Sequence, residues 1–202
     1  MRRTVIACMT ACLAVLVGVL VVAPPAQATL HTATRASSRL AQHTVTYHVE
    51  TRGAVHASMA VFRRQAQATY DDARGWKRAG VRFVRVANGG DFTLVLSQAS
   101  KLPSFSSTCS AQWSCRVGRY VVINQMRWLH ASRVWHTHHR SLRSYRHMVV
   151  NHETGHWLGW SHRGCPHPGA LAPVMMPQSK GLDGCRPNPW PTQAELRVPR
   201  FN

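Results

Sequence analysis

The feature that most constrains this chain is a short run of histidines, a glutamate and a glycine at fixed spacing. His152 and His156 are four residues apart, and Glu153 stands directly after the first of them. Residues i and i+4 lie on the same face of a helix, so one helical turn would place the two histidines side by side. Glycine adopts the left-handed backbone that ends a helix, so Gly159 predicts a turn that brings His162 back toward the pair. The pattern predicts a helix that ends at a three-histidine metal site.

Three imidazoles and a neighbouring carboxylate are typical of a catalytic zinc site. Three protein ligands leave one position of a tetrahedral Zn²⁺ open for water, whose pKa the ion lowers to roughly 7. Glu153 lies about 100° round the helix from His152, so we expect it to act as general base and not as a ligand. The alternative is a surface helix of a histidine-rich chain, since the sequence contains 13 histidines. Gly159 argues against that alternative, because an ordinary helix has no use for glycine there.

The run H-E-x-x-H-x-x-G-x-x-H resembles the motif of the metzincin zinc peptidases at every fixed position. This resemblance implies zinc-dependent hydrolysis of peptide bonds and a methionine-containing turn beneath the metal. Met175 lies thirteen residues after His162 and fits that turn best, with Met176 as the alternative. Methionines also serve simply to fill gaps in a core. Some metzincins add a tyrosine ligand two residues after the methionine, but Pro177 occupies that position here.

Two other stretches are similar to a second group of proteins. Residues 109–124 (CSAQWSCRVGRYVVIN) and 172–190 (APVMMPQSKGLDGCRPNPW) look like a secreted family of high-GC Gram-positive bacteria described only as a domain of unknown function. The resemblance implies an exported protein and adds no substrate.

The N-terminus has the pattern of a secretory signal peptide. Two arginines precede an apolar run over residues 4–23, and residues 26–28 read Ala-Gln-Ala. We expect cleavage after Ala28 and a secreted, extracellular or cell-envelope-associated protein, although the apolar run is also long enough to remain as a membrane anchor. The expected parts are a signal peptide (1–28), a flexible lead (29–42) and a single zinc-peptidase-like domain (43–202) with an upper part (43–162) and a lower part (163–202).

Four cysteines remain once the signal peptide is removed. An even number of cysteines in an exported chain indicates two disulfides, with three pairings open. Local pairing is favoured, which joins Cys109 to Cys115 and Cys165 to Cys185. The second bond would tie the segment after the histidine motif to the segment after Met175. A cysteine zinc site is the alternative, but the cysteines do not form C-x-x-C pairs.

Apolar periodicity predicts an α/β (α+β) fold. Alternation indicates strands, and spacings of three and four indicate helices. The expected elements are strands at residues 44–50, 81–86, 91–97 and 117–124, a helix at 54–74, a zinc helix capped by Ser141 or Ser144, and a short helix after the capping box Thr192–Glu195. A turn of the type that joins hairpin strands is expected at residues 88–90. The order suits a twisted mixed sheet with two helices above a zinc cleft, and the metzincin resemblance implies the same, with a small, loop-rich, disulfide-braced lower subdomain. We expect residues 110–119 to border the cleft.

Several other features have two interpretations each. A formal net charge of +18 would attract anionic cell-envelope polymers, or it could reflect an arginine-rich genome. Nucleic-acid recognition is not expected, because the arginines are scattered and no binding motif is present. Trp157 and Trp160 could line a pocket or pack in the core. Other histidines could form a second metal site or belong to solvated loops, namely His136, His138, His139 and His167.

The leading interpretation is a secreted zinc endopeptidase that binds one Zn²⁺ and acts on a polypeptide substrate. One alternative is a zinc hydrolase of cell-wall amide bonds, which needs the same activated water. Another is an inactive, zinc-stabilised module that binds the envelope. The intact Glu153 argues against an inactive module, because metal binding alone does not need that carboxylate.

Overall fold

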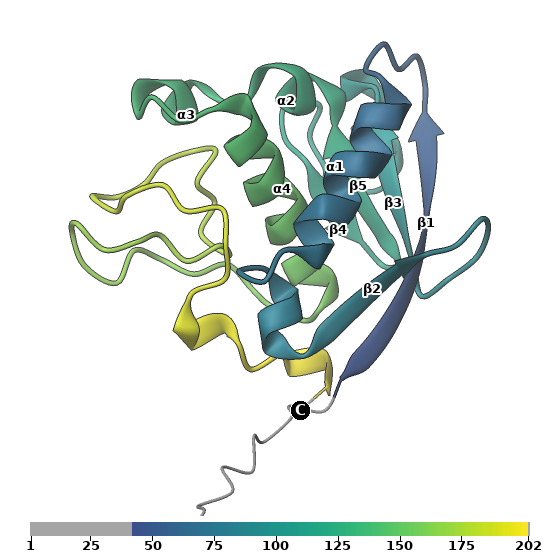
Figure 1. Cartoon of the computed structure of the whole chain (residues 1–202). Helices are drawn as coiled ribbons and strands as arrows, with labels where there is room; N and C mark the ends of the chain where they lie inside the picture. The colour runs from purple at the N-terminus through teal and green to yellow at the C-terminus, as the bar shows by residue number, and fades with distance from the viewer. Residues whose placement is uncertain (1–41, 202) are drawn as a thin grey trace, which may run out of the picture. The chain divides into compact units, whose positions relative to one another are not determined.

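A five-stranded mixed sheet forms the centre of the protein (Figure 1). The computed structural model describes residues 42–201, so the expected signal peptide and nearly all of the lead lie outside the described residues. The strands follow the order β2-β1-β3-β5-β4, and β4 alone runs antiparallel to its neighbour. The strands are β1 (His43–Arg52), β2 (Val81–Arg85), β3 (Phe92–Ser97), β4 (Cys115–Val117) and β5 (Tyr120–Asn124).

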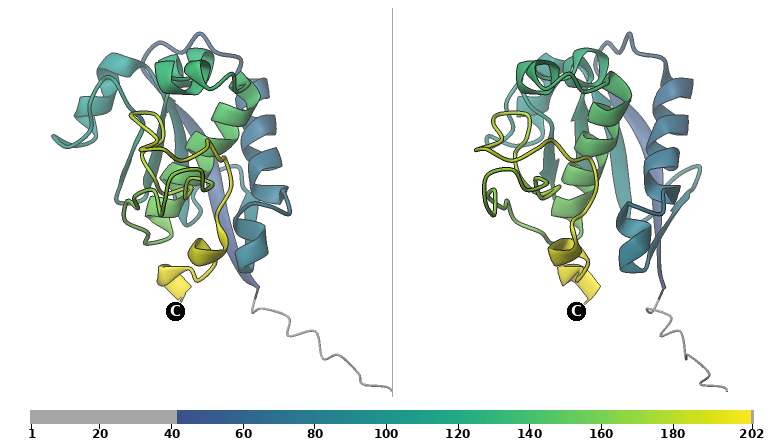
Figure 2. Two further views of the ribbon diagram at one scale, coloured as in Figure 1. Left: turned by 90° about the vertical axis from the view of Figure 1, so that its left-hand side faces the viewer. Right: turned by 60° about the vertical axis from the view of Figure 1, so that its left-hand side comes forward.

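Helices α1 and α4 lie next to each other on one face of the sheet (Figures 1 and 2). Aromatic side chains fill the space between the layers: Tyr47 stacks on Phe92, and Tyr70 of α1 stacks on Phe83. This is the mixed α/β architecture that the sequence predicts. The helices are α1 (Met59–Asp71), α2 (Gln125–His130), α3 (Arg133–Thr137) and α4 (Leu142–Trp157), with 3₁₀ helices at Trp76–Ala79, Ala99–Ser104, Gln193–Glu195 and Pro199–Phe201.

Helix α1 begins at Met59, five residues later than the apolar spacing predicts. The side chain of Ser58 accepts a hydrogen bond from the backbone of Val61 and caps the helix. The residues before it are held by side chains of other elements: Gln98 accepts from the Ala54 N–H, and Gln125 accepts from the His56 N–H. These backbone groups are satisfied outside a helix, so the helix does not extend toward residue 54.

The expected turn at residues 88–90 does not form a hairpin. Strands β2 and β3 are both parallel to β1 and lie on opposite sides of it. The first half of β1 pairs with β2 and the second half with β3, so the short connection only has to pass across the middle of β1. Gly90 makes this crossing at φ +88, and a side chain there would lie 3.0 Å from the carbonyl oxygen of Thr46.

Residues 117–124 were expected to form one strand, but they contribute to an antiparallel hairpin. Gly118, at φ +53, turns the chain between β4 and β5, and Val117 pairs with Tyr120. The disulfide Cys109–Cys115 joins the preceding loop to the start of β4. The hairpin therefore supplies the short edge strand of the sheet, which lies beside α4.

Helix α4 begins where the sequence predicts, because Ser141 accepts a hydrogen bond from the N–H of Ser144 at 3.1 Å. Its helical hydrogen bonding ends at Trp157, and Gly159 follows at φ +97. The short helices α2 and α3, which precede α4, were not predicted. They are too short for apolar periodicity to identify.

The segment of residues 163–191, called the lower segment below, contains neither helix nor strand apart from a single bridge between Leu171 and Arg186. The disulfide Cys165–Cys185 closes most of it into a loop, as the sequence favours. Two disulfides indicate an oxidising, extracellular environment. None of the helices in residues 42–201 is long and apolar enough to span a membrane.

The two disulfides are expected to stabilise the protein unequally. Loss of Cys165–Cys185, which spans 20 residues, should reduce the free energy of unfolding by about 3 kcal/mol, and loss of Cys109–Cys115, which spans 6, by about 2 kcal/mol. Double alanine variants at each pair, unfolded in guanidinium, would measure both values. Equal losses, or a larger loss at Cys109–Cys115, would show that loop closure is not the main source of stability.

Candidate metal centre

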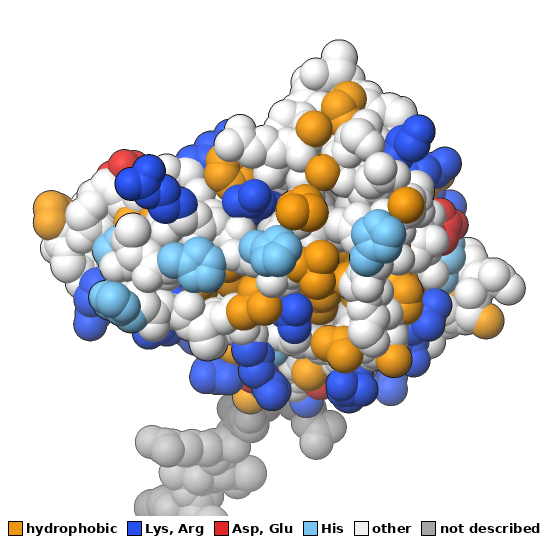
Figure 3. Space-filling model, turned by 90° about the horizontal axis from the view of Figure 1, so that it is seen from above, with side chains coloured by type: hydrophobic (Ala, Val, Ile, Leu, Met, Phe, Trp, Pro, Cys, Tyr) orange, Lys and Arg blue, Asp and Glu red, His pale blue; other side chains and the backbone are white. Residues whose placement is uncertain are grey.

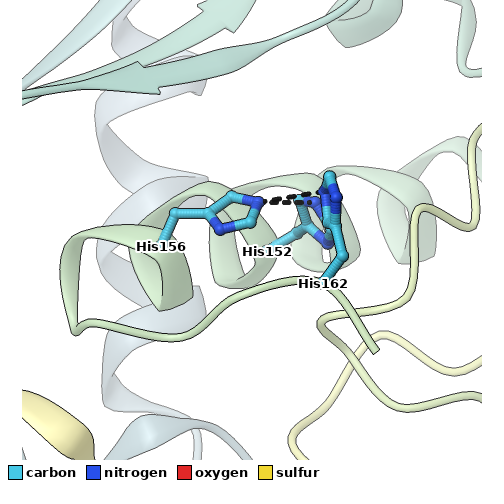
Figure 4. A group of neighbouring side chains, drawn as sticks. All are labelled: His152, His156 and His162. Atoms are coloured by element: carbon cyan, nitrogen blue, oxygen red, sulfur yellow. Dashed lines mark hydrogen bonds between the residues drawn. The ribbon is translucent and has the colours of Figure 1, made fainter. Parts of the chain in front are cut away.

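The three histidines of the motif converge on one point (Figure 4). His152 and His156 project from the last turns of α4, and His162 returns from the chain that follows Gly159. The Nε2 atom of His156 lies 3.2 Å from Nε2 of His152 and 3.2 Å from Nε2 of His162. The helix spacing and the glycine turn thus bring together the three residues that the sequence predicts.

The second nitrogen of two of these rings determines which tautomer is present. Nδ1 of His152 lies 2.8 Å from the carbonyl oxygen of Val174, and Nδ1 of His156 lies 2.8 Å from that of Trp160. A carbonyl oxygen only accepts hydrogen bonds, so both Nδ1 atoms carry the proton and donate it. Nε2 of His152 and Nε2 of His156 therefore each present a lone pair toward the centre of the group, which is the arrangement of metal-ligating histidines.

The donor set fits a transition-metal ion. Two nitrogens bound to a tetrahedral Zn²⁺ at 2.0–2.1 Å would be about 3.3 Å apart, close to the spacing between His156 and its two neighbours. Burial lowers the pKa of all three rings, and for His152 burial and the nearby His156 lower it to about 3. The rings are therefore neutral at neutral pH and can bind a metal. Imidazole suits Zn, Cu, Fe and Ni, so the donors by themselves do not select among these metals.

Glu153 is buried in α4 and lines the same cleft as the three histidines. Its carboxylate accepts no hydrogen bond from any of the described residues, 42–201, so it can still interact with water or substrate. Burial raises the pKa of Glu153 to about 8, and the positive charges of Arg116 and Lys180 act against this rise. The positive charge of a metal ion held by the three histidines would act in the same direction as these two side chains and favour the ionised carboxylate that a base requires. The carboxylate is not part of the group of histidine nitrogens that could share a metal ion.

A cleft of about 580 Å³ opens over the metal centre. One wall comes from residues 108–116, which lead into the edge strand β4, and another from residues 177–180 of the lower segment. Helix α4 forms the floor with Tyr145, Met148 and Val149 beside the histidines and Glu153. The cleft therefore lies between the sheet edge and the lower segment, bordered by much of the stretch 110–119 that the sequence singled out.

Met175 packs directly beneath the metal-binding turn of α4. Its side chain is fully buried, and a β-carbon added at Gly155 would lie 2.2 Å from its sulfur and 2.9 Å from the ring of Trp76. Met176 belongs instead to a separate cluster with Leu182 and the buried Cys185. Of the two methionines, Met175 is the one that contacts the helix bearing the histidines.

Glu195 has a structural role that the sequence analysis missed. It completes the predicted capping box with Thr192, but its carboxylate also accepts hydrogen bonds from the N–H groups of Val174 (3.0 Å) and Met175 (2.9 Å). Because the carbonyl of Val174 in turn accepts from His152, this buried carboxylate fixes the backbone that orients a metal-binding ring. The capping box was visible in the sequence, whereas the contact across 20 residues was not.

The remaining candidate residues lie outside the metal centre. Among residues 42–201, His152, His156 and His162 form the only group of three or more potential ligands whose donor atoms are close enough to bind one ion. Trp157 is buried in the main core, with the guanidinium of Arg200 3.9 Å from its ring centre, and Trp160 packs against the same core. Neither tryptophan lines the cleft, so the core interpretation of both is correct.

The chain belongs to the family described as "Protein of unknown function (DUF3152)", which it matches over residues 22–187. That stretch includes the three histidines that lie close enough to hold a metal ion, and both disulfides. No match to a curated protein is found.

Glu195→Gln should lower the free energy of unfolding by about 2–3 kcal/mol. The amide would keep one acceptor but would point an N–H donor at one of the backbone N–H groups that the carboxylate now satisfies, leaving that buried group unpaired. Zinc affinity should fall as well, because Val174 orients His152. The control is Glu50→Gln, a partly exposed carboxylate whose loss should cost less than about 0.5 kcal/mol. Equal effects of the two substitutions would contradict the role of Glu195.

Gly155→Ala should destabilise the protein by about 1–3 kcal/mol, although alanine is usually better than glycine in a helix by about 1 kcal/mol. The added methyl group would collide with Met175 and Trp76. Gly164→Ala, where nothing lies within 4 Å, is the control and should be neutral or slightly stabilising. Thermal unfolding of both variants would test this, and a stabilised Gly155→Ala protein would rule out the close packing.

Proposed function

For this member of the DUF3152 family we propose a zinc-dependent endopeptidase activity. The proposal rests chiefly on one observation, which is that three imidazole Nε2 atoms converge beside the carboxylate of Glu153. Backbone carbonyls fix the tautomers of two of the three rings. No described residue donates a hydrogen bond to the carboxylate. A purely structural metal site is normally closed by four protein ligands, whereas among residues 42–201 only three candidate ligands converge at this point. A three-ligand site in an open cleft favours chemistry on a bound molecule.

The proposed mechanism assigns one role to each group. Zinc, when bound, supplies a Lewis acid that acidifies water and polarises a carbonyl group. Glu153 would accept a proton from the attacking water and later donate it to the nitrogen that leaves when the carbon–nitrogen bond breaks. The second proton of the water stays on the new carboxyl group and passes from it to the amine, so the products at neutral pH are a carboxylate and an ammonium group. His152, His156 and His162 hold the ion and take no part in the proton transfer.

Features of the cleft support a metzincin-like mode of action. Within residues 42–201, strand β4 pairs on one side only, with β5, so its outer edge is open to an extended polypeptide. A peptide could add to this edge by backbone hydrogen bonds, as in other cases of strand addition. Met175 would serve as the methionine of the metzincin turn, because it packs against Gly155 under the histidines. Pro177 offers no fifth ligand, so three histidines would make up the protein donors.

The metal and the reaction can be tested with one set of variants. The oxidised protein should bind one zinc ion, cleave peptides in a mixed library, and lose activity when a chelator removes the ion. Glu153→Gln should keep the zinc and lose about 10²–10⁴-fold in turnover, because the general base is absent. Zinc content by mass spectrometry of the native protein, and products by peptide mass spectrometry, would measure both effects.

Two histidine variants provide the matched comparison. His162→Ala should lose zinc, whereas His167→Ala, outside the triad, should bind it normally. Loss of zinc from Glu153→Gln would make Glu153 a ligand and overturn the assignment of roles. If zinc binds but neither protein cleaves peptides, digestion of purified peptidoglycan would distinguish a cell-wall amide hydrolase from an inactive module.

A further inference from the structure

Two basic side chains border the cleft, one from each of its walls. Arg116 belongs to the edge strand β4, and Lys180 belongs to the lower segment. Both are exposed, and both are close enough to the metal centre for their charges to act on Glu153. They therefore lie on the two sides of any molecule that would reach the centre of the cleft.

No acidic group balances these two charges. Among the described residues that line the cleft, Glu153 is the only acidic one, and it lies at the floor. Only two ion pairs occur in residues 42–201, His48 with Glu50 and Arg74 with Asp72, and neither involves a residue of the cleft. The charges of Arg116 and Lys180 are consequently available to a ligand.

Trp113 adds a flat surface next to these charges. Its ring lies in the cleft lining, with Nζ of Lys180 6.0 Å from the ring centre and the guanidinium of Arg127 5.5 Å from it. A third cation is therefore close to the same end of the cleft. An extended chain lying in the cleft could therefore contact this group as well as the metal centre.

From this arrangement we infer that the cleft selects acidic peptides, with side-chain carboxylates on residues flanking the bond that lies over the metal centre. The position of that bond over the metal centre rests on the proposed function. The preference for acidic side chains rests on the charges of Arg116 and Lys180. An exposed ion pair is worth at most about 1 kcal/mol, which corresponds to about fivefold in affinity. Two such pairs would give at most about twenty- to thirtyfold for a peptide with two flanking carboxylates.

The general basicity of the protein requires a control. Basic side chains are spread widely over the face shown in Figure 3, while acidic ones are sparse, as the net charge of +18 implies. Any anionic peptide would be attracted to such a surface to some degree. Arg63 and Arg64, exposed on α1 and absent from the cleft lining, allow the overall charge to be lowered equally without changing the cleft.

The test compares two peptides that differ only in having glutamate or glutamine on both sides of the central bond. Binding is measured by calorimetry to the zinc-loaded Glu153→Gln protein, which should not turn the peptides over, and to the metal-free protein. Because carboxylates also bind zinc directly, the metal-free measurement isolates the contribution of the side chains. We expect the glutamate peptide to bind about twentyfold more tightly in both forms at low salt, and the difference to shrink in 0.5 M salt.

The variants decide where the preference comes from. Arg116→Gln with Lys180→Gln should reduce the preference to within about twofold, whereas Arg63→Gln with Arg64→Gln should leave it unchanged. Equal binding of the two peptides to the parent protein would overturn the inference. So would a preference that appears only with zinc bound, or one that the Arg63 and Arg64 substitutions reduce as much as those in the cleft.

Cleavage by the parent protein separates this inference from the proposed function. If the glutamate and glutamine peptides are cleaved equally well, and Arg116→Gln with Lys180→Gln changes nothing, the peptidase function stands and the acidic preference fails. If the glutamate peptide binds through Arg116 and Lys180 but neither peptide is cleaved, the preference stands and the proposed peptidase function fails.

Discussion

The carbonyl of Val174 accepts a hydrogen bond from Nδ1 of His152, and this contact joins the lower segment to the helix that carries two of the three histidines. The lower segment has no core helix or strand, so its position must come from specific contacts of this kind. Glu195 holds the backbone on both sides of Val174, because its carboxylate accepts hydrogen bonds from the N–H groups of Val174 and Met175. A buried carboxylate satisfied by several donors is costly to disturb, which makes it a rigid support for an otherwise irregular segment.

Close packing supplies the second support of the metal centre. Gly155 lets Met175 approach α4 at a distance that any side chain would prevent, and the ring of Trp76 packs closely at the same position. The indole N–H of Trp76 also donates to the carbonyl of Asn151, one residue before the first histidine. The helix turn that carries His152 and His156 is thus held by contacts with the lower segment and with the 3₁₀ helix before β2. Tightly packed residues around metal-binding side chains restrict the rotamers of those side chains and so keep the donor atoms in place.

The sequence allowed the metal centre to be predicted better than the sheet. The positions of His152, His156 and His162 follow from helix periodicity and one glycine, which are local properties of eleven consecutive residues. The arrangement of β2 and β3 is not a local property, because β1 lies between them. The glycine-rich turn that connects them therefore led to the wrong prediction, that the two strands pair with each other. The second set of hydrogen bonds to Glu195 was invisible for the same reason. The sequence shows that Arg116 and Lys180 are basic, but it does not show that they border the same cleft, which only the fold reveals.

The position of β1 at the centre of the sheet has a consequence for how the chain folds. Both of its edges need partners, and these come from β2 and β3, about 40 residues further along the chain. Until residues 81–97 are in place, β1 has two unpaired edges and no neighbour to cover them. Sheets built from such distant parallel pairs form slowly and expose strand edges in the meantime. The histidine-bearing helix α4 packs against β5 and α1, so its buried face gains its partners only where this sheet has formed.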